Sequence, residues 1–293
     1  MGVQAHPVSW FVRVLWLALP FTLGDAIGQA LANRSAHVAL VATVIAWIGW
    51  AIGAVALVAA LPAALTATRI VGPAAPPVAA AAAWWGDLDA LTVAGLVLAS
   101  LAAVLSCSGW IADDHVDGPS YGDERRFSLR APGPLLVGAV PLAWVVVVVG
   151  AVSGPMLLAA HQWLVGAILT VVGLVLGAAA ARSLHTLSTR FVVFVPAGMT
   201  LVDPSSIIDA VLFPRTSILG FGPAPLEGER CDLSQQALGL ALEVVTREAT
   251  HLTVRTGRRT AEERAARAVV FTPARPAAVL AEAATRDIAT AGV

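Results

Sequence analysis

No charged residue occurs in the 51-residue segment from Ala131 to Ala181, and this run constrains the fold more than any other feature of the sequence. As one helix it would be about 75 Å long, more than twice the ~30 Å hydrocarbon core of a bilayer. The Ser153–Pro155 segment lies near its middle and favours a turn. We therefore expect two membrane-spanning helices, at about 134–152 and 156–181, joined as a tight hairpin.

Two further segments are free of charge over the length of a membrane helix. Val38–Leu61 contains Thr43 as its one polar side chain, and the segment 90–112 ends where Asp113 begins an acidic stretch. The whole chain is 58% hydrophobic and 13% charged, whereas a soluble domain carries roughly 25% charged residues. The sequence therefore predicts a membrane protein with at least four spans.

Two other apolar segments are less regular. The segment 8–32 carries Arg13, Asp25 and Gln29. Because a charge at the centre of a span costs about 2.5–3.5 kcal/mol on insertion scales, Arg13 must reach the interface and Asp25 must face protein or water. The segment 70–86 is short and is interrupted by prolines, but it ends in a Trp pair of the kind found at membrane interfaces. Including it gives six spans, and leaving it out gives five.

The placement of arginine favours the six-span count, because short loops that carry Arg prefer the cytoplasm. Six spans with a cytoplasmic N-terminus put seven arginines inside and only Arg34 outside, whereas five spans put six inside and two outside. We therefore expect a multi-pass protein of the cell membrane with both termini in the cytoplasm. The seven arginines are Arg13, Arg69, Arg125, Arg126, Arg130, Arg182 and Arg190.

From residue 182 onwards, short segments divided by Pro and Gly replace the long apolar runs and predict a cytoplasmic domain, 182–293, that follows a transmembrane domain, 1–181. Thr272 and Pro273 are expected as the N-cap and first residue of a closing amphipathic helix. The segment 255–267 holds five arginines and is expected to be a solvated loop or the start of a helix between strands. The expected fold is an α-helical transmembrane bundle followed by a small antiparallel β domain, with strands at 190–195, 199–203, 210–213, 217–221, 237–246, 251–255 and 267–271.

Three stretches of this domain follow a familiar order: the hairpin RFVVFVPAGMTLVD, the strand unit AVLFPRTSI, and a final strand that runs into a helix, VVFTPARPAAVLAEA. In this order they resemble the bacterial pleckstrin-homology-like domains that follow membrane spans. With YGDERRFSLR before a membrane hairpin, the whole chain resembles an uncharacterised multi-span membrane family of high-GC bacteria. The resemblance implies an interaction or assembly domain, and it supplies no catalytic residue.

Composition excludes several function classes. All eighteen basic residues are Arg, so a lysine base, a Schiff base or a phosphate-loop lysine is impossible. The net charge of −1 and the lack of a basic stripe argue against a nucleic-acid partner. Cys107 and Cys231 lie in different parts of the chain, which leaves no disulfide framework. Because the metalloprotease, nucleophile-elbow, Walker and dinucleotide motifs are absent from the sequence, we expect no catalytic residue and no cofactor.

The strongest candidate for a metal site consists of Asp113, Asp114 and Asp117. Their Asp-Asp-x-x-Asp spacing also occurs in the magnesium-pyrophosphate sites of prenyl-transfer enzymes. Carboxylate oxygens are suitable ligands for Mg²⁺. However, those sites lie on helix faces and need a second acidic motif, whereas here a Gly-Pro pair follows at once. The alternative is a solvated acidic loop paired with the arginines of the next stretch.

The stretch Tyr121–Arg130 mixes both charge signs and holds the single Tyr of the chain. We expect it either to dock on the cytoplasmic domain or to serve as a juxtamembrane anchor. Arginines near the spans can meet anionic headgroups, at about 1 kcal/mol per residue, although positive-inside topology alone would produce the same residues. The candidates for protein or lipid contact are Tyr121, Arg125, Arg126, Arg130, Arg182 and Arg190.

Three polar side chains lie within expected spans, and intramembrane carboxylates are functional candidates. Asp25 and Gln29 are spaced i to i+4 on one helix face, and His161 is the one His well within a span. A proton or ion pathway would use such residues. The alternative is that Asp25 has a structural partner or lies near an interface.

The sequence as a whole favours a non-enzymatic adaptor or accessory subunit. Its cytoplasmic domain is expected to bind a protein partner, a second copy of the chain or membrane lipids, through its exposed edges and the Tyr121–Arg130 stretch. The rival interpretation is a small-molecule or ion transporter, or a membrane enzyme, that uses Asp25 or the Asp113–Asp117 cluster.

Overall fold

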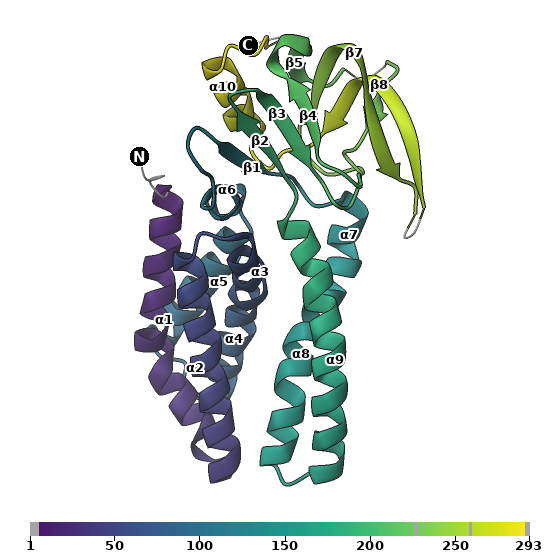
Figure 1. Cartoon of the computed structure of the whole chain (residues 1–293). Coiled ribbons are helices and arrows are strands. Elements are labelled where there is room, and N and C mark those ends of the chain that lie inside the picture. Colours follow the sequence, from purple (N-terminus) through teal and green to yellow (C-terminus); the bar gives the residue numbers. More distant parts are fainter. Residues whose placement is uncertain (1–5, 226–227, 258–259, 291–293) are drawn as a thin grey trace. The chain divides into compact units, whose positions relative to one another are not determined.

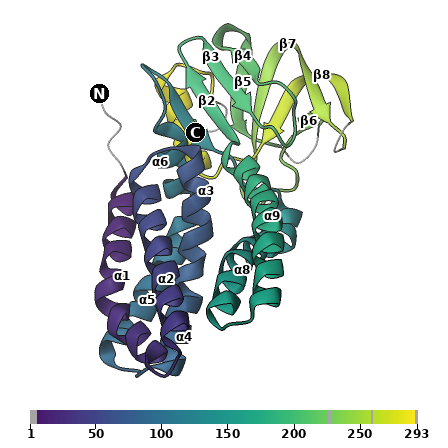
Figure 2. The same cartoon turned by 60° about the horizontal axis from the view of Figure 1, so that its bottom comes forward.

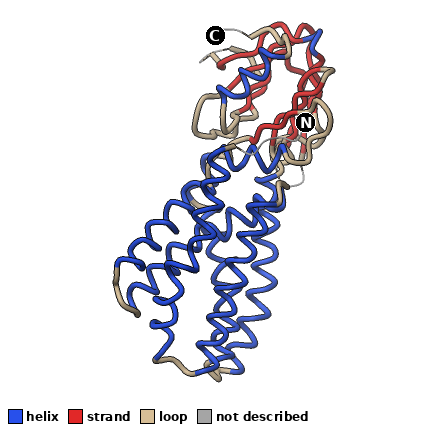
Figure 3. Tube along the Cα trace, turned by 90° about the vertical axis from the view of Figure 1, so that its left-hand side faces the viewer, coloured by secondary structure: helices blue, strands red, loops and turns tan. Residues whose placement is uncertain are grey.

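The computed structural model describes residues 6–225, 228–257 and 260–290, and the chain divides into two compact units. The first, here called the helical unit, comprises Met1–His115 and Pro141–His185. The second, here called the β unit, comprises Val116–Val140 and Thr186–Val293. Figures 1 and 3 show that the described strands all belong to the β unit.

Among its described residues, the helical unit contains four helices that are long and apolar enough to cross a membrane: α1 (Pro7–Ala32), α2 (Ala36–Val58), α8 (Ala139–Ala159) and α9 (Trp163–Ser188). The count rises to five if α5 (Ala90–Ser106) and α6 (Gly109–Asp117), which are bent by 58°, form one span. The spans expected at 8–32 and 38–61 coincide closely with α1 and α2. This composition is that of a membrane protein.

The segment expected as a short span at 70–86 belongs to a longer, broken helical stretch. It consists of α3 (Pro62–Val71), a 3₁₀ turn at Gly72–Ala74, and α4 (Ala75–Trp85). The break occurs at Pro73, which lacks the N–H that would continue the hydrogen-bond ladder. Gly72 also has no room for a side chain, because Ser106 of α5 occupies that space.

The membrane hairpin turns later than the sequence indicates. The turn was expected at Ser153–Pro155, but α8 continues through Pro155 to Ala159 and the turn occupies 160–162. A proline inside a membrane helix is tolerated when neighbouring groups compensate for the lost hydrogen bond. The expected break at Ser153–Pro155 is therefore wrong, and this part of α8 serves helix packing instead.

Glycine brings α8 and α9 close together. A Cβ at Gly150 would lie 2.9 Å from the carbonyl oxygen of Gly173, and a Cβ at Gly154 would lie 2.5 Å from the backbone nitrogen of Thr170. Small residues at such positions permit the close backbone approach on which helix association in membranes depends.

Side chains join this hairpin to the rest of the helical unit. Trp144 donates its indole N–H to the carbonyl oxygen of Ile70 at 2.8 Å, and His185 hydrogen-bonds Thr66 at 2.9 Å. At the other end of the unit the rings of His37 and His161 meet edge to face, with centroids 5.2 Å apart.

The described part of the β unit contains two four-stranded sheets (Figure 2). The first is an antiparallel meander of β1 (Arg125–Ser128), β2 (Phe191–Val195), β3 (Gly198–Val202) and β4 (Val211–Pro214). The second has the order β5 (Ile218–Pro223), β7 (Leu242–Arg255), β8 (Ala261–Phe271) and β6 (Cys231–Asp232), in which only the short β6–β8 pairing is parallel. The remaining elements are α7 (Gly133–Val137), a 3₁₀ turn at Arg215–Ser217 and α10 (Pro276–Thr285).

Backbone contacts join the two sheets at two corners. At one corner Leu129 forms a bridge with Pro273, and at the other Ile207 forms a bridge with Val254. The backbone N–H of Arg130 donates to the carbonyl oxygen of Thr272 at 2.9 Å beside the first bridge. The strands therefore enclose a common interior.

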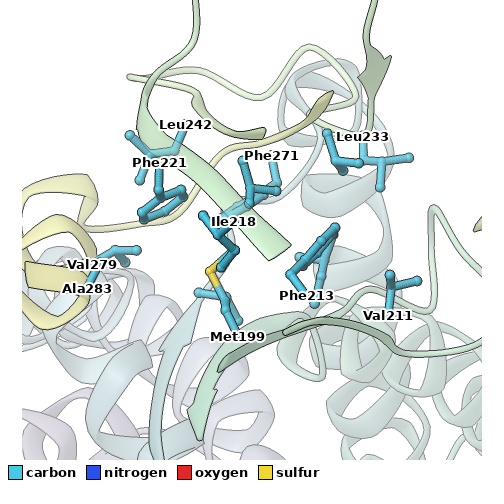
Figure 4. Close-up of a cluster of buried hydrophobic side chains, with 14 of the residues drawn as sticks. Met199, Val211, Phe213, Ile218, Phe221, Leu233, Leu242, Phe271, Val279 and Ala283 are labelled. Carbon is cyan, nitrogen blue, oxygen red and sulfur yellow. The ribbon is translucent and has the colours of Figure 1, made fainter. Parts of the chain in front are cut away.

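Hydrophobic side chains from both sheets and from α10 fill that interior (Figure 4). Met199 and Phe213 come from the first sheet, and Phe221 and Phe271 of the second stack with ring centroids 6.1 Å apart. From α10, Val279 reaches the same cluster one turn before Ala283. The expected closing helix thus packs its apolar stripe against the core.

The second sheet differs from the expected strands. The strands expected at 237–246 and 251–255 are one strand, β7, which begins at Leu242 and has an irregularity between Val245 and Thr250. In the segment 255–267, residues 261–267 belong to β8 and form neither a solvated loop nor a helix start, and Arg258 and Arg259 lie outside the described residues. Three charged residues in a row, Glu262, Glu263 and Arg264, are exposed there, so both faces of the strand meet solvent and the apolar–polar alternation that predicts a strand is missing.

The closing helix also begins later than expected. It starts at Pro276 after Arg275, and not at Thr272–Pro273. The backbone of Thr272 and Pro273 is already paired with Arg130 and Leu129, respectively. This pairing with the first sheet holds the two residues in extended structure.

Candidate functional site

The three aspartates of the acidic stretch lie on the helix α6 or at its end, not in a loop. Asp114 accepts a hydrogen bond from the backbone N–H of His6 at 2.9 Å and another from the hydroxyl of Ser9. It therefore holds the N-terminal end of α1. Asp113 is buried and lies within electrostatic range of Arg69 on α3.

Asp117 holds the chain that leads into β1. Its carboxylate accepts the backbone N–H of Arg126 at 2.7 Å and the hydroxyl of Ser120 at 2.9 Å, and it pairs with Arg125. Among the residues that the structure describes, no group of three or more His, Cys, Asp or Glu side chains is placed to hold a metal ion. The three carboxylates are thus directed to different partners.

The intramembrane polar residues are also separated. Asp25 is exposed on α1, whereas the side-chain oxygen of Gln29 accepts the backbone N–H of Asp87 at 2.9 Å. His161 lies in the α8–α9 turn with a left-handed φ of 61° and contacts the ring of Trp163. Gln29 and His161 each connect helices of the helical unit.

The stretch Tyr121–Arg130 is itself part of the β unit. Arg125–Ser128 is the strand β1 and pairs with β2 in the register Arg125–Phe194 to Ser128–Phe191. Arg126 pairs with Glu124 at 2.9 Å and lies over the ring of Phe191. Tyr121 stays 88% exposed, and Arg182 is exposed on α9.

Arg190 is buried, although the sequence placed it among the lipid-facing candidates. Its Nε and Nη2 atoms donate to the two carboxylate oxygens of Asp203, each at 2.7 Å, and the two side chains are 2% and 1% exposed. Its Nη1 donates to the carbonyl oxygen of Arg130 at 2.8 Å. A buried arginine requires such a paired, hydrogen-bonded setting.

Asp203 extends this network to a distant loop. The hydroxyls of Ser205 and Ser206 donate to its carboxylate at 2.7 Å. The amide of Gln235 in turn donates to the carbonyl oxygen of Ser205 at 3.2 Å. Sequence reasoning missed Asp203; the available signal was its position opposite Arg190 at the open end of the expected hairpin 190–203.

Burial raises the pKa of the Asp203 carboxyl, but the hydrogen bonds and charge of Arg190, with the hydroxyls of Ser205 and Ser206, outweigh it and hold the pKa below its ordinary value. A carboxyl with a lowered folded-state pKa stabilises the fold above its unfolded pKa of about 3.9, and that stability is lost as the pH falls toward the folded-state value.

We therefore expect the β unit to lose stability on acidification through the range below about pH 5. Hydrogen exchange of the β2 and β3 backbone in the full chain, followed from neutral to acidic pH, measures this loss. The Asp203→Asn variant should lack this component of the pH dependence. An unchanged pH profile in the variant would assign the acid sensitivity to other carboxyls.

The β7–β8 hairpin leaves one strand edge open. Beyond the irregularity, Thr250–Arg255 pairs with Ala261–Ala266. On its other side β8 pairs with β6 at Val269 and Val270, so the edge over 261–267 has no strand partner among the described residues. Its residues 261–265 are all exposed. An open edge of this kind can accept a further strand.

Comparisons of the chain with protein-family models, curated proteins and solved structures gave no match.

Proposed function

We propose that this protein is a non-enzymatic membrane adaptor or accessory subunit whose β unit binds a protein partner at the open edge of β8. The observation that carries the proposal is the exposed edge over 261–267, whose backbone groups can pair with an added strand. Glu263 and Arg267 lie on one face of that strand, so a partner strand with complementary charges would be favoured.

The covalent order of the elements supports an anchored platform. Strands β1 and β2 are neighbours in one sheet, yet the chain between them contains α8 and α9, two helices of membrane length. The first sheet can form only when the chain has left the β unit, crossed the apolar hairpin and returned. The β unit is thereby held to the membrane through both strands.

We propose further that the β unit is pleckstrin-homology-like. A four-stranded meander, three antiparallel strands (β5, β7 and β8) and a C-terminal helix against the core support this assignment. One feature departs from the domains that it resembles. Those domains follow their membrane spans, whereas β1 here precedes the hairpin.

We also propose six spans with both termini in the cytoplasm. Contacts within the helical unit support an even number of crossings, because Gln29–Asp87 and His37–His161 gather the α1–α2, α4–α5 and α8–α9 connections at one end. At the opposite end, the guanidinium of Arg13 donates to the carbonyl oxygen of Leu57. The six crossings would be α1, α2, α3–α4, α5–α6, α8 and α9.

Cross-linking in the native membrane tests the adaptor function. A photo-reactive amino acid at Ala265 should give one major adduct with one protein, and native mass spectrometry of gently extracted protein should show that protein at a fixed stoichiometry. The matched control is Leu219 of β5, which is also exposed but lies away from the β8 edge. The same adducts at both positions, or none at Ala265, would contradict the proposal.

Two substitutions separate the adaptor from the transporter or membrane enzyme. Asp25→Asn and Asp114→Asn should leave partner binding and the cellular phenotype intact wherever the protein is expressed and folded. A lost phenotype with partner binding retained would instead favour chemistry at Asp25 or at the Asp113–Asp117 stretch.

A further inference from the structure

An exposed apolar face occurs on the β unit where α7 meets the loop 234–241, which joins β6 to β7. Val137 is 86% exposed and Leu238 is 65% exposed, and neither is in a hydrophobic cluster with the core. A cluster of large, exposed aliphatic side chains marks a surface that contacts a protein or a membrane. We define the apolar face by its five exposed aliphatic residues: Leu135, Leu136, Val137, Leu238 and Leu240.

Close backbone contacts place the loop beside α7. Gly133, the first residue of α7, packs so tightly against the carbonyl oxygen of Gln236 that a side chain would not fit. Gly239, at a left-handed φ of 124°, faces Arg130, whose Nε would lie 3.0 Å from a Cβ at that position. The two leucines on either side of Gly239 are therefore presented next to the start of α7.

The loop is held in this shape at an energetic cost. Gln235 and Gln236 adopt left-handed φ values of 52° and 55°, which are unfavourable for residues other than glycine. Gln235 is fixed by hydrogen bonds to Ser205, and Ser205 donates to Asp203 of the buried ion pair. Strain that the surrounding structure maintains is a feature of functional sites.

The chain itself identifies what covers the face. Val137 ends α7 and Ala139 begins the apolar helix α8, so a single residue, Gly138, separates the apolar face from a candidate membrane span. Arg130, which is exposed, lies next to the loop. Aliphatic side chains beside an arginine match the boundary between acyl chains and phosphate headgroups, because the guanidinium can stay at the phosphates.

We propose that the apolar face inserts into the headgroup region of the membrane that holds α8, with Leu238 and Leu240 among the acyl chains. This is a second binding surface, separate from the β8 edge, and its ligand is lipid. It goes beyond the adaptor function and does not depend on it, because the loop can rest on lipid whether or not a protein binds β8.

A fluorescent label on single cysteines tests the insertion in the full chain. Cys107→Ser and Cys231→Ala remove the native thiols, and Leu238→Cys carries an environment-sensitive fluorophore in nanodiscs with one chain each. The matched control is Leu219→Cys, an exposed leucine (54%) of β5 in the same unit. We expect the label at 238 to be blue-shifted and quenched by lipids with a spin label on the acyl chain, and the label at 219 to be quenched by aqueous iodide.

Equal iodide quenching at the two positions, with hydrogen exchange showing a folded β unit, would overturn the proposal. Protection at 238 that occurs in native membranes but disappears in the nanodiscs would also overturn it, because a protein would then be the occupant. A label at Leu240→Cys repeats the measurement where Leu238→Cys perturbs the loop. We further expect phosphatidylglycerol in the nanodisc to increase the protection at 238, and Arg130→Gln to remove that increase.

Discussion

Asp203→Asn destabilises the β unit by about 3–5 kcal/mol, because it leaves the charge of Arg190 buried without its carboxylate partner. The side chains of Arg190 and Asp203 are 2% and 1% exposed, so water cannot solvate the guanidinium once the carboxylate is lost. Hydrogen exchange of β2 and β3 in the full chain measures this loss. All nine tryptophans lie in the helical unit, so tryptophan fluorescence reports whether that unit stays folded.

A double variant shows whether the buried charge is the cause. Arg190→Met combined with Asp203→Leu removes both charges and fills the space with apolar side chains, and it should recover part of the stability that Asp203→Asn loses. A loss below about 1 kcal/mol for Asp203→Asn would show that the pair contributes no more than a surface ion pair. A double variant less stable than the single variant would show that the hydrogen bonds to Ser206 and to the backbone of Arg130 matter more than the charge balance.

Local patterns were enough to predict much of the β unit. The β-branched and aromatic run 190–195, the turn at Pro196–Gly198 and the returning strand agree with β2 and β3 to within a residue or two. The expected strands at 210–213 and 217–221 agree with β4 and β5 in the same way. β2, β3 and β4 pair with their neighbours in the sequence, so period and turn residues specify their structure. β5 pairs instead with β7, so its period predicts the strand but not its partner.

Long-range pairing was beyond such patterns. β1 has four residues, two of them charged, and its partner β2 begins at Phe191, on the far side of the membrane hairpin. Arg125 and Arg126 therefore read as surface residues, and only the pairing itself makes Phe127 part of the core. Arg190 is a different case, because Asp203 lies opposite it at the open end of the expected hairpin 190–203, and the pattern predicts the hairpin but not the burial of the pair.

Two elements that the sequence predicts wrongly, a turn and the start of a strand, have local structural causes that the residue composition does not reveal. Ser153–Pro155 breaks a helix in water, but in α8 the glycine serves close packing against α9 and the proline is accommodated. Leu238 and Leu240 alternate with small residues like a strand, but the left-handed backbone at Gln235, Gln236 and Gly239 turns that segment into a loop. Periodicity alone cannot distinguish these cases.

Residues 186–293 expressed alone should not fold to a stable domain, because the β unit needs β1, which precedes the membrane hairpin in the sequence. Without β1, the core lacks Phe127 and Leu129, each 4% exposed. Burying two such side chains contributes about 3–6 kcal/mol to the free energy of unfolding. This is a large share of the total, which is roughly 5–15 kcal/mol for a typical domain. Circular dichroism and thermal unfolding of this fragment should show no cooperative transition.

A shortened chain should restore the fold without any membrane helix. The backbone N–H of Leu129 donates to the carbonyl oxygen of Arg190 at 3.0 Å, so Arg130 and Thr189 lie opposite each other at the end of the β1–β2 ladder. Joining 116–130 to 189–293 through Asn-Gly, the residues of a type I′ turn, keeps that register. This chain should be soluble and unfold cooperatively, and Phe127→Ala should destabilise it by about 3–5 kcal/mol.

The comparison of the two chains decides whether β1 belongs to the folding unit or only rests on it. Equal melting temperatures for the joined chain and for residues 186–293 would mean that β1 is dispensable and that the first sheet is complete with three strands. A cooperative transition in the joined chain alone would mean that the membrane hairpin is an insertion between two strands of one domain. In that case the β unit of the natural chain cannot finish folding until β2 has followed α8 and α9 out of the ribosome, and the condition of its fold is β1 and not the membrane hairpin.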